Sequence, residues 1–407
     1  MRRIPKRLWL PLAGLLALGL VAAVLVRTQD DEGGHLAANR AQLKNACGGL
    51  LPYGELRGAV PDQVPGTLDE YGTLLEPAQE SRSLVNCTLA WQGHGSLQVQ
   101  AVALASHLPY ELKTKDLLAE GYEAPGITGR YTDEGGRLWV VAECPKGLTG
   151  RVRPVSQMYV TVALEKASIR KSFRVAVAVA DAITKRQNCG SRTPLKAPAR
   201  VIDTYEEHFD GGKDDYEVDR IDEPGRGVKK CRWISDRRTA PLRGTWITSG
   251  DLQESRLLDA CQGTRWDELS GEYTDPEPAE LEPSSLDAAS WSGELGLSAY
   301  RDYRRDGDAP GITTPSPGKY TDTKAPESLA LWARSQCAGG ATYHRVSIRP
   351  TLDTQVEEGD EVLLTPDQRA QLSRSVRKVM DSYLTSEGGW PKTQHCHDTE
   401  LLGEVEE

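Results

Sequence analysis

A ten-residue segment occurs twice in this chain, and a similar pattern follows each copy. APGITGRYTD at residues 124–133 returns as APGIT at 309–313 and GKYTD at 318–322. Next comes a strand-like run with a Leu-Trp pair that ends in cysteine, RLWVVAEC at 137–144 and ALWARSQC at 330–337. Chance explains so long a match poorly. The chain is therefore predicted to contain two related domains, because repeats of about 150 residues are domain duplications rather than solenoid units.

Each copy continues with a further strand and then with a helix. MYVTVALEK at 158–166 and HRVSIRPTL at 344–352 are rich in β-branched residues and predict the strands. The apolar stripes that follow are Ile169, Phe173, Val177, Ala180 and Ile183 in the first copy, and Leu372, Val376, Val379 and Tyr383 in the second. We therefore expect an α+β fold with two tandem related domains after an N-terminal transmembrane helix. Each domain is an antiparallel sheet with a C-terminal helix packed on one face.

The transmembrane helix is expected at residues 8–26, LWLPLAGLLALGLVAAVLV, a run without any charge. A helix of that length covers about 28 Å, close to the thickness of the bilayer's hydrocarbon core. Four basic residues within positions 1–7 predict a cytoplasmic N-terminus. An uncleaved anchor is favoured over a removed secretory signal, because no A-x-A cleavage site ends the run. Either interpretation exports residues 28–407, and the anchor predicts a single-pass protein of the cell membrane.

The eight cysteines predict disulfides, because all of them lie in the exported part. It is ambiguous how the first part of the second copy, around Cys231 and Cys261, aligns with that of the first copy. The stretch from Cys231 resembles the hairpin at Cys87, whereas ACQGTRWDEL around Cys261 resembles ACGGLLPYGEL around Cys47, which is the reverse order. Either the second unit is rearranged or one match is due to chance. By position we expect no free thiol and the pairs Cys87–Cys144, Cys231–Cys337, Cys47–Cys189 and Cys261–Cys396.

The exported part is acidic. The chain has 49 Lys plus Arg and 59 Asp plus Glu, and removing the five basic residues of positions 1–27 leaves 44 basic against 59 acidic residues. Such a surface repels phosphate backbones, so nucleic acid is excluded as a partner. The predicted organisation is a cytoplasmic stub at 1–7, the transmembrane helix at 8–26, a linker at 27–40, extracytoplasmic α+β domains at 41–190 and 191–398, and an acidic tail at 399–407.

Known catalytic and metal-binding motifs are incomplete. Ser168 and Ser375 each begin an S-x-x-K pattern of penicillin-binding enzymes, but the K-T-G companion fails at its glycine in residues 392–394. The cluster HCHD at 395–398 lacks further ligands for a structural zinc site. The acidic loop at 210–217 lacks the residue order of an EF-hand. We predict no catalytic residue, no metal and no cofactor.

Two interpretations of the repeated segment are open. The Pro-Gly loop is either a turn that brings the Leu-Trp strand into the sheet or part of a paired recognition surface. Tyr and Arg are frequent in binding hot spots. On the second interpretation the binding residues are Tyr131 and Tyr320, presented beside Arg130 and Lys319.

The opening of the first module, CGGLLP at Cys47–Pro52, resembles uncharacterised membrane-anchored or secreted actinobacterial proteins with cysteine-bounded extracytoplasmic modules. The resemblance covers the anchor and this opening, and it implies no activity. We expect a non-catalytic, membrane-anchored cell-envelope protein whose duplicated domains bind a protein or a wall component. The alternative is an extracytoplasmic hydrolase with an unrecognised serine nucleophile, for which Ser168 and Ser375 are the first candidates.

Overall fold

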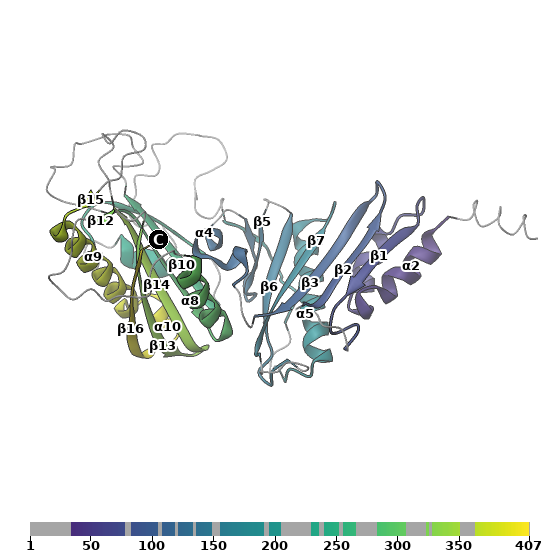
Figure 1. The fold of residues 1–407 in the computed structure, drawn as a ribbon. Coiled ribbons are helices and arrows are strands. Elements are labelled where there is room, and N and C mark those ends of the chain that lie inside the picture. Colours follow the sequence, from purple (N-terminus) through teal and green to yellow (C-terminus); the bar gives the residue numbers. More distant parts are fainter. Residues whose placement is uncertain are drawn as a thin grey trace, which may run out of the picture.

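The computed structural model describes residues 34–406, with gaps at 78–82, 105–107, 119–120, 133–135, 149–154, 191–194, 205–228, 236–239, 252–254, 266–282, 307–322, 325–327 and 351–362. We call the described parts of 34–204 the first lobe and those of 229–406 the second lobe. Each lobe is built around one large antiparallel sheet, and the two lobes lie side by side (Figure 1).

The first sheet has eight strands in the order β1-β2-β3-β7-β6-β5-β4-β8. Their bounds are β1 Gly66–Tyr71, β2 Ser83–Trp91, β3 Gly95–Ala103, β4 Tyr122–Glu123, β5 Gly129–Thr132, β6 Arg137–Glu143, β7 Gln157–Leu164 and β8 Ile202–Asp203. Side chains alternate between the two faces, so Leu138, Val140 and Ala142 of β6 enter one core while Trp139 and Val141 enter another.

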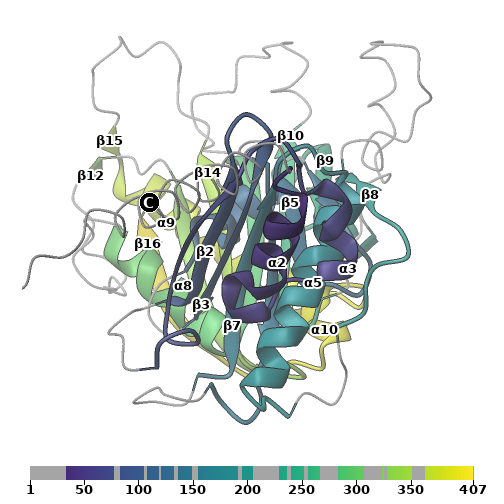
Figure 2. The same cartoon turned by 90° about the vertical axis from the view of Figure 1, so that its right-hand side faces the viewer.

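Helices cover one face of this sheet (Figure 2). The long helix α5, Ile169–Arg186, follows β7 and buries the predicted stripe, including Phe173 and Ile183. The elements that precede the first strand in the chain are α2 Leu36–Asn45, η2 Ala46–Gly49, α3 Tyr53–Leu56 and η3 Arg57–Ala59. The first-domain expectation of a sheet with a helix packed on one face is therefore confirmed.

The second sheet has six strands in the order β16-β13-β14-β11-β10-β9. Their bounds are β9 Trp246–Gly250, β10 Leu258–Arg265, β11 Pro283–Ser292, β13 Leu329–Cys337, β14 Gly340–Pro350 and β16 His397–Glu406. The other elements of this lobe are η6 Lys229–Ile234, α8 Glu294–Asp306, α9 Pro366–Thr385, α10 Trp390–Thr393 and the short pair β12 Thr323–Lys324 and β15 Leu363–Leu364. Helix α9 packs on β13 and β14, and it begins with the predicted capping box at Thr365 and Gln368.

The strand orders show the duplication. β1, β2, β3, β7 and β6 of the first sheet occupy the same successive places as β9, β10, β11, β14 and β13 of the second. A long helix then follows β7 and β14 alike. The order of elements is retained, so the second unit is not rearranged. The two resemblances between the fronts of the copies were both due to chance.

The predicted disulfide pairing is wrong. The bonds are Cys47–Cys87, Cys144–Cys189, Cys231–Cys261 and Cys337–Cys396, and the described residues contain no free cysteine, as expected. Each lobe has one bond from a helical turn to the second strand of its sheet. Its other bond joins the end of β6 or β13 to the chain after the long helix. Each predicted pair combined one cysteine from each of the two bonds of the same lobe.

The acidic tail predicted at 399–407 is also wrong over most of its length. Residues 397–406 form β16, which pairs with β13 at the edge of the second sheet. Glu404 is buried against α9, where Arg377 lies 3.1 Å and Arg369 lies 3.5 Å from its carboxylate. The charges that suggested a solvated tail therefore form ion pairs within the fold.

No helix within the described residues is long and apolar enough to cross a membrane. The longest, α9, has twenty residues and carries six charged side chains. The stretch expected to span the bilayer, 8–26, lies outside the described residues, as do the predicted stub and most of the linker. Within the described residues the fold class is therefore corrected to a mixed α+β structure with two antiparallel sheets, in which no helix could span a membrane.

The lobes share a hydrophobic cluster at their junction. It includes Trp139 and Tyr159 from the first sheet and Trp291 and Trp332 from the second. The segment between β3 and β4, with η4 Tyr110–Leu112 and α4 Thr114–Leu117, lies beside α8 at this junction (Figure 1). The Trp291 indole donates a hydrogen bond of 2.9 Å to the carbonyl of Leu112. The junction is thus packed as a core.

Candidate functional site

The first copy of the repeated segment forms a turn between β4 and β5. The Ile127 N–H donates to the Ala124 carbonyl at 3.1 Å, and Gly126 has φ +77°, a value that glycine adopts without a Cβ penalty. β5 then pairs with β6, which carries the Leu-Trp pair. The turn interpretation is confirmed for this copy. The second copy, 309–322, lies outside the described residues.

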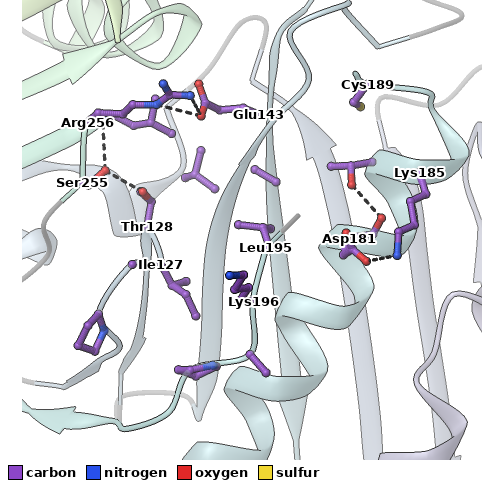
Figure 3. Close-up of a pocket in the computed structure, with 18 of the residues that line it drawn as sticks. Ile127, Thr128, Glu143, Asp181, Lys185, Cys189, Leu195, Lys196, Ser255 and Arg256 are labelled. Atoms are coloured by element: carbon purple, nitrogen blue, oxygen red, sulfur yellow. Dashed lines mark hydrogen bonds and ion pairs between the residues drawn. The ribbon is translucent and has the colours of Figure 1, made fainter. Parts of the chain in front are cut away.

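This turn borders a cleft of about 820 Å³ that extends from the first lobe to the second (Figure 3). Four parts of the first lobe line it, namely the turn at 125–128, the end of β6 at 141–143, the end of α5 with the residues after it, and the segment 195–199. Residues 255–257 of the second lobe complete the lining. The cleft is the candidate binding site, since concave sites between packed units are common ligand sites.

The wall contributed by the second lobe is held in place by hydrogen bonds. The hydroxyls of Thr128 and Ser255 lie 2.7 Å apart, and the Trp390 indole donates to the Ser255 carbonyl at 2.7 Å. The guanidinium of Arg256 pairs with the Glu143 carboxylate at the end of β6, where Nε lies 3.2 Å from Oε2. The contacts of Thr128 with Ser255 and of Glu143 with Arg256 connect the two lobes at this end of the cleft (Figure 3).

The opposite wall is the last part of α5. Lys185 and Asp181 form an ion pair of 2.5 Å on this helix, and the Thr184 hydroxyl donates to the Asp181 carbonyl at 2.8 Å. Lys196 is exposed on the segment that crosses the cleft. The lining residues include no histidine, and Cys189 is bonded to Cys144. This set of side chains offers both signs of charge and hydroxyl groups to a ligand.

One strand edge borders the cleft. β5 pairs with β6 from Thr132 to Gly129, opposite Arg137 to Val140, whereas β6 continues to Glu143. One further bond, from the Val141 N–H to the Thr128 carbonyl at 2.8 Å, extends the ladder. Ala142 and Glu143 therefore lie beyond the last residues of β6 that pair with β5.

Arg130 and Tyr131, the described residues among those predicted for binding, do not line this cleft. Arg130 is 1% exposed and its Nε donates to Glu123 Oε1 at 2.9 Å inside the first lobe. Burial raises the pKa of the Glu123 carboxyl against the opposing effect of Arg130. Tyr131 is half-buried, with its ring edge-on to Tyr122 at 6.0 Å. Arg130 is thus a core residue, and binding by Tyr131 stays a prediction.

The remaining candidates have ordinary positions or lie outside the described residues. Tyr320 and Lys319 are among the latter. Ser168 is the N-cap of α5, where its hydroxyl accepts the Lys171 N–H at 3.4 Å. Ser375 is half-buried on α9. The S-x-x-K pattern at Ser168 is explained by helix capping.

A buried set of polar groups in the second lobe was not predicted. Asp259, Ser290 and His344 are direct neighbours on β10, β11 and β14, and we call them the polar row. All three are 0% exposed. The hydroxyl of Tyr383, a residue of α9, lies 2.8 Å from the Asp259 carboxylate and 2.7 Å from the Ser290 hydroxyl.

Lys230 compensates the charge of this set. Its ammonium lies 2.6 Å from the Asp259 carboxylate and 2.7 Å from the Asp251 carboxylate. The Asp251 carboxylate also accepts a hydrogen bond from the Ala260 N–H. Burial alone lowers the pKa of Lys230, but the two carboxylates outweigh it and raise the pKa above its usual range. Burial raises the pKa of Tyr383 well above its usual value and lowers that of His344 to about 3.

The matching row of the first lobe is aliphatic. Counting back two residues from Cys87 and from Cys261 makes Val85 the equivalent of Asp259. Val85 pairs with Ala101 and Ala101 with Val160, and we call these three residues the apolar row. This equivalence follows from the strand order and register, so the sequence alone gave no signal for the polar row. The polar row is closed to solvent, so it is not an open active site.

One group of metal-ligating residues occurs among the described residues. Cys337, Cys396 and His344 offer ligand atoms within 4.8 Å of one another. The two sulfurs form a disulfide in this structure. The predicted cluster at 395–398 contributes only its cysteine to this group, since His397 instead lies 2.9 Å from Asp398.

Comparisons of the chain with protein-family models, with curated proteins and with solved structures gave no match.

Proposed function

We propose that the chain is a non-catalytic binding protein of the cell envelope and that its described lobes lie outside the cytoplasm. Four disulfides support this location, because such bonds persist in oxidising compartments. A C-terminal fusion to alkaline phosphatase tests it, since that enzyme is active only outside the cytoplasm. An inactive phosphatase fusion, together with a C-terminal fluorescent-protein fusion that is fluorescent in the cytosol, would contradict the proposal.

The ligand is an extended segment of a partner protein, bound in the cleft. The observation that carries this proposal is the end of β6, where Ala142 and Glu143 border the cleft beyond the pairing with β5. Peptides often bind by adding a strand to such an edge, and neighbouring side chains then provide specificity. Lys196 and the ion pair of Asp181 with Lys185 offer both signs of charge to those side chains.

Site-specific photo-crosslinking in the native cell tests this proposal. A photoreactive phenylalanine analogue replaces Ala197, which is exposed on the cleft lining. The matched control replaces Ala38, an exposed alanine of α2 that does not line the cleft. A discrete protein adduct is expected at position 197 and none at position 38. Equal labelling at both positions, or no protein adduct at either, contradicts the proposal.

Three further variants distinguish the remaining functions. Ala197→Trp fills the cleft and is expected to abolish the adduct formed from a second cleft position, Lys196. Ser168→Ala and Ser375→Ala are expected to leave that adduct unchanged. Cleavage of the crosslinked partner in the wild type, but not in one of these serine variants, would instead indicate a hydrolase. Sedimentation with purified cell wall separates a wall ligand from a protein ligand, since only the former removes the protein from solution.

A further inference from the structure

The disulfide Cys337–Cys396 is the most accessible of the four. The six cysteines of the other disulfides are between 0% and 1% exposed. Cys337 and Cys396 are half-buried, at the end of β13 and after α10. Thiol–disulfide exchange requires access to a sulfur atom, so a reductant reaches this bond first.

His344 lies beside this bond and has one free ring nitrogen. A ring nitrogen of His344 and the two sulfurs are within 4.8 Å of one another. Nδ1 lies 2.6 Å from the Ser290 hydroxyl, whereas Nε2 is buried and has no hydrogen-bond partner among the described residues. A buried polar atom without a partner is costly, and the imidazole that carries it adjoins two potential metal ligands.

The hydrogen-bond chain of the polar row determines which nitrogen carries the proton. The Tyr383 hydroxyl donates to Asp259, so its oxygen accepts the hydrogen of Ser290. The Ser290 oxygen then accepts from the Nδ1–H of His344. Nε2 is therefore left with a lone pair. A histidine that ligates zinc commonly has this arrangement, in which its other nitrogen donates to a fixed acceptor.

We propose that Cys337, Cys396 and His344 Nε2 form a zinc site when the Cys337–Cys396 disulfide is reduced. A dithiol reductant breaks the S–S bond, supplies two electrons and two protons, and closes to its own disulfide. Zn²⁺ then replaces the two thiol protons, which pass to solvent. Tetrahedral zinc holds sulfur and nitrogen ligands roughly 3.5–3.8 Å apart, which is compatible with this group, and water completes the shell.

The first lobe provides an internal comparison. Its equivalent disulfide, Cys144–Cys189, is buried, and Val160 stands where the second lobe has His344. The ligand chemistry is therefore confined to one of two equivalent positions. This proposal is independent of the cleft and of any ligand bound there.

The test uses the full chain, treated with graded dithiothreitol and freed of it by anaerobic gel filtration. Alkylation and mass spectrometry identify which cysteines are reduced, and near-ultraviolet circular dichroism reports the folded state. Zinc binding is measured by competition with a chromophoric chelator, and cobalt replaces zinc to give the absorption of tetrahedral thiolate coordination. We expect reduction of Cys337 and Cys396 first, uptake of one zinc per chain, and no uptake by the oxidised protein.

His344→Val introduces the residue of the first lobe and is expected to weaken zinc binding by more than about 100-fold. Ser290→Ala, which removes the acceptor for Nδ1–H, is expected to weaken it at least about tenfold. Cys144→Ala with Cys189→Ala is the matched control and should leave uptake unchanged. Absence of zinc uptake by the reduced wild type, equal uptake by His344→Val, or loss of the folded signal upon this reduction would each overturn the proposal.

Discussion

The two lobes share a strand order but fill the same row of their cores in opposite ways. In the first lobe Val85, Ala101 and Val160 form the apolar row, whereas Asp259, Ser290 and His344 occupy these places in the second. The first lobe demonstrates that this architecture folds around aliphatic side chains. Buried polar groups usually contribute less stability than well-packed apolar ones, so this architecture does not require a polar row in order to fold.

Removal of Lys230 gives the largest expected effect on this comparison. Ala46, directly before Cys47, stands at the equivalent place in the first lobe. Lys230→Ala is expected to cost about 3–5 kcal/mol of unfolding free energy, because it leaves Asp251 and Asp259 buried without their cation. Urea unfolding measures the loss. A loss below about 1 kcal/mol would mean that the carboxylates are neutral or solvated.

The matched control gives the polar row the residues of the apolar row and also removes the Tyr383 hydroxyl. Asp259→Val, Ser290→Ala, His344→Val and Tyr383→Phe together remove the polar row and leave Lys230 paired with Asp251 alone. This variant is expected to be at least as stable as the wild type. A large loss of stability would instead show that the second lobe depends on its polar row to fold.

Acid sensitivity is the next effect in size. The pKa of His344 is lowered from 6.5 to about 3 by burial, so the unfolded chain binds a proton more readily between these values. The stability contribution of His344 is therefore complete above pH 6.5 and is lost progressively as the pH falls toward 3. From pH 7 to 4.5 the wild type is expected to lose about 2–3 kcal/mol more than His344→Val. Urea unfolding of both proteins at pH 7 and at pH 4.5 measures these losses. Equal losses of unfolding free energy in the two proteins would refute the prediction.

The two long helices offer a smaller comparison through their N-caps. Thr365 of α9 takes part in a full capping box, whereas Ser168 of α5 accepts one bond of 3.4 Å. Thr365→Ala is expected to cost about 1–2 kcal/mol and Ser168→Ala about 0.5–1 kcal/mol. Equilibrium unfolding of both variants ranks the caps, and a larger cost at Ser168 would contradict this ranking.

The smallest effect is expected at an exposed ion pair of the first lobe. Arg174 pairs with Glu55, and their side chains are 48% and 33% exposed. Arg174→Ala should change the unfolding free energy by less than about 1 kcal/mol, because water screens such pairs. The buried pair of Arg369 with Glu404 in the second lobe is the contrast. Similar losses after Arg174→Ala and Arg369→Ala would remove that distinction.

Long patterns predicted the fold better than short ones did. The repeated segment, the Leu-Trp strands and the amphipathic helices predicted two related α+β units correctly. The fronts of the copies were matched by a few letters around cysteines, and those matches assigned Cys231 and Cys261 to the wrong elements. The disulfide pairing failed because the positions of the cysteines along the chain do not show which elements are neighbours in the fold. The strand at 397–406 was missed because its acidic residues find Arg369 and Arg377 only in the folded state.

The candidate sites were predicted only in part. The Pro-Gly turn was anticipated, but the cleft beside it requires residues 255–257, which no sequence pattern linked to it. Arg130 seemed exposed because arginine usually is, yet Glu123 accompanies it into the core. The polar row consists of residue types that individually suggest a surface, and its members become neighbours only through strand register.

The disulfides of this protein span 40, 45, 30 and 59 residues, and none of them joins one lobe to the other. Each half is consequently sealed by its own covalent loops. A protease that cuts once between Asp203 and Cys231 would produce two fragments, each closed by its own disulfides, that stay associated through noncovalent contacts, among them the tryptophan-rich junction and the pair of Arg256 with Glu143. On a denaturing gel without reductant such a nicked molecule would run as two bands, whereas in native solution it would still behave as one particle.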